Sequence, residues 1–214
     1  MRVRNHLLVI ISVFILALGI AFSVKSDLGT SPISSVPYVL SLGLYLTIGE
    51  FTIIFNALLL LLQIIILKRD FDIVQLLQLP LCILLGYFID FHVFLLNSIT
   101  YTNYFQQFIL LILGCFIVAF GVFLSVKANS LILPGDGLIR VISQIVNRDF
   151  GKLKPIFDIS VFSLSVVISL ILFSSVVGVR EGTIISAVFT GFIIQFYEKI
   201  MGNRIDKIFN QDIS

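Results

Sequence analysis

The sequence predicts an all-α polytopic membrane protein made of two homologous halves, each with three transmembrane helices and one short re-entrant half-helix. Three observations lead to this prediction. Hydrophobic residues make up 58% of the 214 residues, charged residues make up only 12%, and the mean hydropathy is +1.12, which lies outside the range of soluble domains. The chain also repeats itself. In each repeat, one apolar segment is too short to cross a bilayer.

The repeat emerges when the sequence is shifted by 102 residues. Residues 19–25 (GIAFSVK) then align without a gap with residues 121–127 (GVFLSVK), and Pro32 aligns with Pro134. A repeat at a fixed period indicates two copies of one structural unit. We therefore expect a first membrane repeat over residues 1–104, a second over residues 105–203, and a polar C-terminal tail over residues 204–214.

Six apolar runs are long enough to span a membrane, because a helix that rises about 1.5 Å per residue needs about 20 residues to cross the hydrocarbon core. They are Leu7–Val24, Phe51–Leu67, Leu76–Leu96, Phe105–Val126, Pro155–Val177 and Thr183–Met201. The first run follows a basic N-terminus but precedes no small-x-small cleavage site, so we expect it to remain as a transmembrane helix. Pro155 suits the first position of its helix, where its missing N–H costs no hydrogen bond.

Two further apolar runs, Ile33–Tyr45 and Gly135–Val146, are too short to span unaided, and each follows a polar break that contains a proline. Charge placement favours re-entry. If all eight runs crossed, Lys68, Arg69 and Lys127 would lie outside the cell, against the preference of Lys and Arg for cytoplasmic loops. Re-entrant segments keep these residues inside, with both chain termini. An eight-span protein with parallel repeats is the alternative.

Re-entry has a consequence for the architecture. Each repeat then crosses the membrane three times, so the second repeat is inverted relative to the first. Many transporters have this design, and their broken helices meet near the bilayer midplane. Non-helical backbone at that depth is tolerated only where protein or a water-filled cavity satisfies it.

Asp136 and Arg140 are the first candidate site residues, because they lie in the short segment of the second repeat. The free N–H groups at the start of this segment favour an anion. Asp136 would cap the helix itself, or the two residues, four apart on one helical face, would neutralise each other. The competing hypothesis is contact with a substrate or ion, since a charge at membrane depth is costly and marks functional sites.

Four more candidates come from the repeat itself. Lys25 and Lys127 occupy equivalent helix ends, where they either extend to the lipid headgroups or guard opposite mouths of one pathway. Asn129, like its equivalent Asp27, is a turn former or a hydrogen-bonding group at such a mouth. Asp158 aligns with Asn56 and is expected to pair with Arg140 across helices.

Other polar and small residues have structural interpretations. Glu50 lies near the start of a long helix and is expected to cap it. Asp90 and His92 are expected to be interfacial. The four glycines interpreted as close-packing points between helices are Gly19, Gly86, Gly121 and Gly191.

Several function classes lack their necessary residues. The sequence contains no nucleophile–His–acid set, no phosphate-binding glycine loop and no HExxH motif, so we expect neither an enzyme nor a cofactor. Cys82 and Cys115 lie in apolar runs and are interpreted as packing residues, and no metal-ligand cluster is present. The net charge of +2 is too small to indicate nucleic-acid binding.

Two stretches resemble a known family. Residues 19–32 (GIAFSVKSDLGTSP) are similar to the opening motif of the bacterial YczE/YyaS-type integral membrane proteins. Residues 133–137 (LPGDG) resemble the central motif of the related YitT-type proteins, which has two adjacent glycines where this chain has Gly135 and Asp136. The resemblance implies a multi-pass protein of the bacterial cell (inner) membrane and assigns no substrate.

The first functional hypothesis is a small-solute transporter or channel-like protein, with the lipid bilayer as its environment and an anionic or zwitterionic solute at a pseudo-symmetric site. The second is a non-transporting accessory or regulatory partner that acts through its basic cytoplasmic loops. A membrane enzyme is a third and weaker hypothesis. The sequence leaves open the solute, the coupling ion and whether the chain forms a homo-oligomer.

Overall fold

A computed structural model describes residues 3–128 and 132–210, which form α-helices and short connections and contain no strand. The first half contains α1 (Val3–Lys25), α2 (Pro32–Gly43), α3 (Ile48–Leu67) and α4 (Gln78–Leu95). The second half contains α5 (Tyr104–Lys127), α6 (Pro134–Val146), α7 (Phe150–Phe173) and α8 (Glu181–Asn210). Each half therefore has the same order of long and short helices.

Six of these helices are long and apolar enough to cross a membrane, and α2 and α6 are the two that are not. The short helices have 12 and 13 residues, which correspond to about 18–20 Å, against about 30 Å for the hydrocarbon core. The chain is thus an all-helical, multi-pass membrane protein, as the composition predicts.

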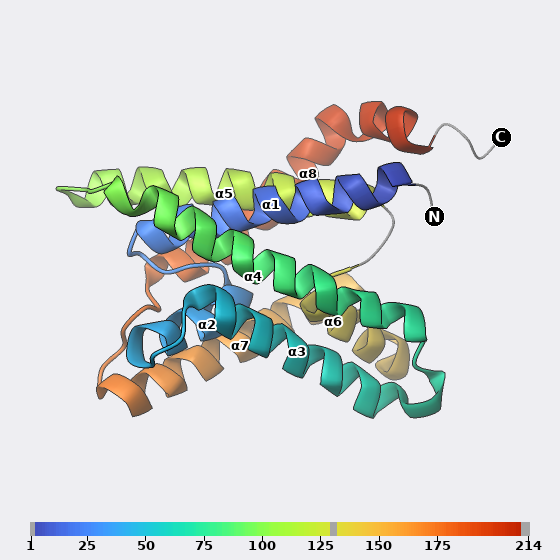
Figure 1. Ribbon diagram of the computed structural model, residues 1–214, viewed down its shortest axis with the longest axis horizontal. Coiled ribbons are helices and arrows are strands. Elements are labelled where there is room, and N and C mark those ends of the chain that lie inside the picture. The colour runs from blue at the N-terminus through green and yellow to red at the C-terminus, as the bar shows by residue number, and fades with distance from the viewer. Residues whose placement is uncertain (1–2, 129–131, 211–214) are drawn as a thin grey trace.

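The long helices α1 and α5 lie antiparallel along the middle of one layer (Figure 1), with α4 packed against α1 and α8 packed against α5. Glycine lets the two central backbones approach closely. A Cβ on Gly19 would lie 2.5 Å from the backbone nitrogen of Val118, and one on Gly121 would lie 2.7 Å from that of Leu16. The 102-residue shift relates Gly19 to Gly121 and Leu16 to Val118, so it converts each of these two contacts into the other.

The glycine predictions are confirmed in three places out of four. Gly19 and Gly121 lie at the α1–α5 crossing, and Gly86 lies against the backbone oxygen of Gly49 on α3. The prediction for Gly191 is wrong, because a Cβ there would meet nothing within 4 Å. Gly191 lies on α8, the span with the smallest buried share.

The second layer consists of α2, α3, α6 and α7 (Figure 1), in which α2 packs against α3 and α7, and α6 packs against the same two helices. One apolar cluster joins these four helices. Most of its members are pairs related by the 102-residue shift, namely Val36 with Leu138, Leu40 with Ile142, Phe55 with Phe157, and Leu59 with Val161.

Hydrogen bonds in the first turn of α3 explain where this helix begins. Thr47 and Glu50 form a reciprocal capping box at the start of α3, so the predicted capping role of Glu50 is confirmed. Asp90 of α4 reinforces this end, because it accepts hydrogen bonds from Thr47 Oγ1 at 2.6 Å and from the Gly49 N–H at 2.8 Å. His92, in the last turn of α4, is buried, and its Nδ1 lies 2.7 Å from the carbonyl oxygen of Phe88.

The start of α7 differs from the prediction. The helix begins at Phe150, after the left-handed residue Asn147 ends α6 and Asp149 provides the extended N-cap. Pro155 lies inside the helix, where it removes one backbone hydrogen bond. Lys154, which directly precedes the predicted span Pro155–Val177, is therefore on α7, four residues before Asp158.

Candidate functional site

The N-termini of α2 and α6 meet in the interior of the molecule. Each helix opens with a proline, Pro32 or Pro134, whose missing N–H costs nothing at that position. The position of a Cβ on Gly135 is occupied by the end of the Ile33 side chain, which would have to move to admit a larger residue. Ile33 and Gly135 are equivalent under the 102-residue shift. The two short helices thus touch at matching positions.

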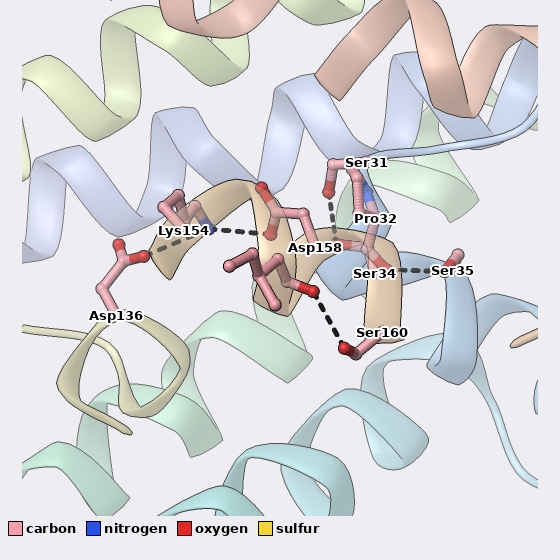
Figure 2. Close-up of polar contacts among 9 residues, drawn as sticks. Ser31, Pro32, Ser34, Ser35, Asp136, Lys154, Asp158 and Ser160 are labelled. Atoms are coloured by element: carbon pink, nitrogen blue, oxygen red, sulfur yellow. Dashed lines mark hydrogen bonds and ion pairs between the residues drawn. The ribbon is translucent and has the colours of Figure 1, made fainter. Parts of the chain in front are cut away.

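An ion-pair cluster lies at this junction. Lys154 Nζ is 3.3 Å from Asp136 Oδ1 and 3.1 Å from Asp158 Oδ1, and Figure 2 shows the lysine between the two carboxylates. Lys154 and Asp158 share one face of α7 because they are four residues apart, whereas Asp136 comes from the first turn of α6. Two helices of the second repeat, α6 and α7, are thus joined at one point.

The cluster is neither fully buried nor fully solvated. The exposed fractions are 33% for the Lys154 side chain, 35% for Asp136 and 17% for Asp158. One lysine neutralises one of the two carboxylates, which leaves one excess negative charge when both are ionised. The positive end of the α6 dipole, beside Asp136, favours that charge.

The first repeat carries the neutral counterpart of this cluster. Under the 102-residue shift, Asp136, Lys154 and Asp158 correspond to Ser34, Thr52 and Asn56, and all three of these residues are buried. Ser34 accepts a hydrogen bond from Ser31 at the start of α2, at 3.0 Å. Asp158 lies on the side of Lys154 that faces this first turn of α2 (Figure 2), and α2 packs against α7. The junction therefore combines a neutral and a charged half-site.

Arg140 does not belong to this cluster. The expected pairs of Arg140 with Asp136 and with Asp158 are not formed, because Lys154 contacts both carboxylates. Arg140 lies one turn further along α6, is exposed, and lines a hollow next to the connection between α3 and α4. Lys154 lies just before the predicted span Pro155–Val177, so the sequence did not predict that it would compete with Arg140 for Asp136 and Asp158.

Lys25 and Lys127 lie at opposite ends of the molecule, because each ends its helix and α1 and α5 are antiparallel (Figure 1). Lys25 Nζ is 3.3 Å from Asn97 Oδ1, just beyond the end of α4. Lys127 Nζ is 2.7 Å from Glu198 Oε1 on α8. Lys25 is therefore held by the segment that follows the last helix of the first repeat, and Lys127 contacts the last helix of the second. Asn129, the remaining candidate, lies outside the described residues.

Sequence reasoning missed a second buried polar contact next to the junction. Gln63 of α3 donates a hydrogen bond to the carbonyl of Pro134 at 3.0 Å and lies 3.5 Å from Gln78 Oε1. Its own Oε1 is buried and has no partner among the described residues. Gly137 provides the space for this side chain. The signal was present, since Gln63 interrupts a long apolar run.

Neither a metal nor a disulfide site is evident within the described parts of the chain. No three His, Cys, Asp or Glu side chains there are grouped closely enough to hold a metal ion. Cys82 and Cys115 are buried free thiols on different helices. The chemistry of the site is therefore that of charge pairing and hydrogen bonding.

The fold and the junction define a multi-pass integral membrane protein whose described residues include six helices long enough to span and two short helices that touch near their N-termini. The chain belongs to a family of unknown function, DUF6198, whose model matches residues 3–199. It is similar to two proteins of Bacillus subtilis (strain 168). One is the uncharacterized protein YyaS, with 26% identity over 193 residues, which cover 89% of this chain and 90% of YyaS.

The other is the uncharacterized membrane protein YczE, with 28% identity over 184 residues, which cover 85% of this chain and 80% of YczE. The resemblance seen in residues 19–32 is thereby confirmed over most of the chain. None of the solved structures matches this chain at a significant level.

Proposed function

We propose that this protein is a small-solute transporter or channel-like protein in which α2 and α6 re-enter the membrane from opposite sides. The two repeats are then inverted relative to each other. The antiparallel packing of α1 and α5 supports this arrangement, as do the exchanged contacts of Gly19 and Gly121. So does the matched apolar cluster of α2, α3, α6 and α7.

One observation carries the proposal: the short helices meet at their N-termini, Ile33 against Gly135, next to the Asp136–Lys154–Asp158 cluster. Helix N-termini present unpaired N–H groups and a positive dipole end. Inverted-repeat transporters bind solutes and coupling ions where two such broken helices converge. The junction thus has the geometry of a solute site, and its two helix N-termini favour an anionic or zwitterionic solute.

The orientation follows from charge. The N-terminus, the α3–α4 connection and the α6–α7 loop lie at one end of the molecule, and the uncharged α4–α5 connection lies at the other (Figure 1). The basic end is proposed to face the cytoplasm of a bacterial cell, in agreement with the positive-inside rule. Both chain termini are then cytoplasmic.

The test is whether water reaches the junction. In a protein with Cys82 and Cys115 replaced by alanine, Ser34→Cys introduces a thiol of nearly the same shape in the first turn of α2. We expect a membrane-impermeant methanethiosulfonate reagent to modify this thiol in proteoliposomes slowly but measurably. The matched control is Ser165→Cys on α7, a serine that is completely buried and donates to the backbone carbonyl of Phe162.

The proposal requires Ser34→Cys to react about ten times faster than Ser165→Cys, because a pathway must hydrate one position and not the other. Equal, negligible rates at both positions, with normal labelling of an exposed loop cysteine, would contradict transport. The chain would then be better described as a non-transporting partner that acts through its basic loops.

A further inference from the structure

A hollow of about 430 Å³ opens between α6 and the connection that joins α3 to α4. Its size lies within the range of small-molecule sites, about 300–1,000 Å³. Six polar side chains line it, namely Asp70, Asp72, Gln75, Gln78, Arg140 and Gln144. It lies on α6 beside the ion-pair cluster but shares no side chain with that cluster.

The hollow contains opposite charges that do not pair. Arg140, on α6, and Asp70, in the connection that follows α3, both line it. Neither side chain forms an ion pair or a hydrogen bond with any residue among those that the structure describes. Asp72 uses one carboxylate oxygen to cap the following turn, at Val74 N. Charges of both signs are therefore available to a ligand.

This arrangement selects for a ligand with two charges. A simple anion drawn to Arg140 is repelled by Asp70 and Asp72, and a simple cation drawn to the carboxylates is repelled by Arg140. A zwitterion can pair with Arg140 and with the two carboxylates at the same time, and such complementary charges give specificity. The amides of the three glutamines add neutral donors and acceptors.

The floor of the hollow is built for polar contact. Gln78 is only 4% exposed although it lines the hollow, and it accepts from Gln63, whose Oε1 is buried and unpaired within the described chain. Gly137, also in the lining, abuts Gln63. Gly137 directly follows Asp136, so the floor adjoins the first turn of α6.

We propose that this hollow binds a zwitterion, with the anionic group of the ligand at Arg140 and its cationic group at Asp70 and Asp72. The same chemistry occurs in a free solute of amino-acid type and in the headgroup of phosphatidylethanolamine. The inference does not rest on the transport function, because binding is measured directly and the residues of the Lys154 cluster take no part in it.

The experiment uses the full chain in nanodiscs of phosphatidylglycerol, a lipid without a zwitterionic headgroup. Calorimetric titrations compare glycine and O-phosphoethanolamine with three ligands that carry charge of one sign only, namely acetate, inorganic phosphate and ethanolamine. We expect at least one zwitterion to bind about ten times more tightly than each of its analogues with charge of one sign. Equal binding of the analogues, or binding of none of the five ligands, overturns the proposal.

Charge reversal provides the decisive variants. Arg140→Asp and Asp70→Arg should each weaken zwitterion binding about tenfold, since one wall then repels the ligand. The double variant should recover most of the affinity, because both charges still face the hollow, in exchanged places. All four positions used are exposed, and the controls Arg148→Asp and Asp149→Arg, in the next loop, should leave binding unchanged. A folded double variant that fails to recover binding contradicts the proposal.

A second lipid composition distinguishes the two sources of the zwitterion. If a free solute is the ligand, its affinity persists in nanodiscs that contain phosphatidylethanolamine. If the lipid headgroup is the ligand, the affinity for the free probe falls in those discs, and native mass spectrometry detects phosphatidylethanolamine retained by the wild type but lost from Arg140→Asp.

Discussion

Lys154 is the residue on which the junction depends. It lies between two aspartates from different helices, at 3.3 and 3.1 Å. When one member of a partly buried ion pair is removed, the remaining charge has no partner. The resulting loss of stability is larger than the contribution of an exposed surface pair. Two carboxylates left together would also repel each other. The lysine therefore holds α6 against α7 by charge as well as by contact.

The first prediction concerns this lysine. Lys154→Met keeps most of the apolar side chain but leaves Asp136 and Asp158 unpaired, and it should lower the free energy of unfolding by about 1–3 kcal/mol. Asp136→Asn should change it by less than about 1 kcal/mol, because Lys154 and Asp158 still form a neutral pair. Thermal unfolding in detergent measures both variants.

The matched control is Lys152→Met. Among the described residues, Lys152 forms an ion pair with Asp149 alone, at 3.7 Å, and both side chains are largely exposed, at 72% and 81%. Such surface pairs contribute about 0–1 kcal/mol. If Lys152→Met and Lys154→Met destabilised the protein equally, the cluster would not be what fastens α6 to α7.

At the scale of elements, the α1–α5 pair is the structural centre of its layer. Close approach of two backbones requires that no Cβ stand between them, and Gly19, Gly114 and Gly121 all face such contacts. Each contact involves backbone atoms of the opposite helix, which cannot rotate away as a side chain can. The crossing therefore depends on glycine at these positions.

The second prediction follows from that geometry. Gly19→Ala should destabilise the protein by about 1–3 kcal/mol, because the new methyl group overlaps the backbone of Val118 and forces the helices apart. Gly191→Ala should be neutral or stabilising by up to about 1 kcal/mol, since nothing lies within 4 Å and alanine favours a helix. Equal losses in both variants would contradict the packing role of Gly19.

At the scale of the whole molecule, the alternation of the helices places the connections at two ends. Asp70 and Lys152 lie near the end that contains the N-terminus, and Thr100 lies in the α4–α5 connection at the other end (Figure 1). All three residues are exposed. They report the orientation of the protein without disturbing its interior.

The third prediction uses these positions. In intact cells that express the cysteine-free protein, Thr100→Cys should react with an impermeant reagent, whereas Asp70→Cys and Lys152→Cys should react only after the membrane is made permeable. This pattern is required if both short helices re-enter, because each repeat then crosses three times. Labelling of Asp70→Cys from outside would mean that α2 spans, and the inverted arrangement would be lost.

Local features of the sequence predicted most of the fold. The lengths of the six spans, the two short helices after Pro32 and Pro134, and the capping role of Glu50 all depend on residues close together in the chain. The start of α7 was misplaced by five residues, because Pro155 was taken as a start signal while Asp149 provides the N-cap. That error removed Lys154 from the set of candidates.

The sequence by itself determined that this is a multi-pass membrane protein with two matching halves. The free energy of transferring a segment from water into the bilayer and the length of a helix are both properties of continuous segments. Only the tertiary structure decided which charges meet. The partners of Asp136, the separate position of Arg140 and the contact of Gln63 with α6 depend on how each helix is rotated about its axis. Packing between segments far apart in the chain sets that rotation, and no local pattern encodes it.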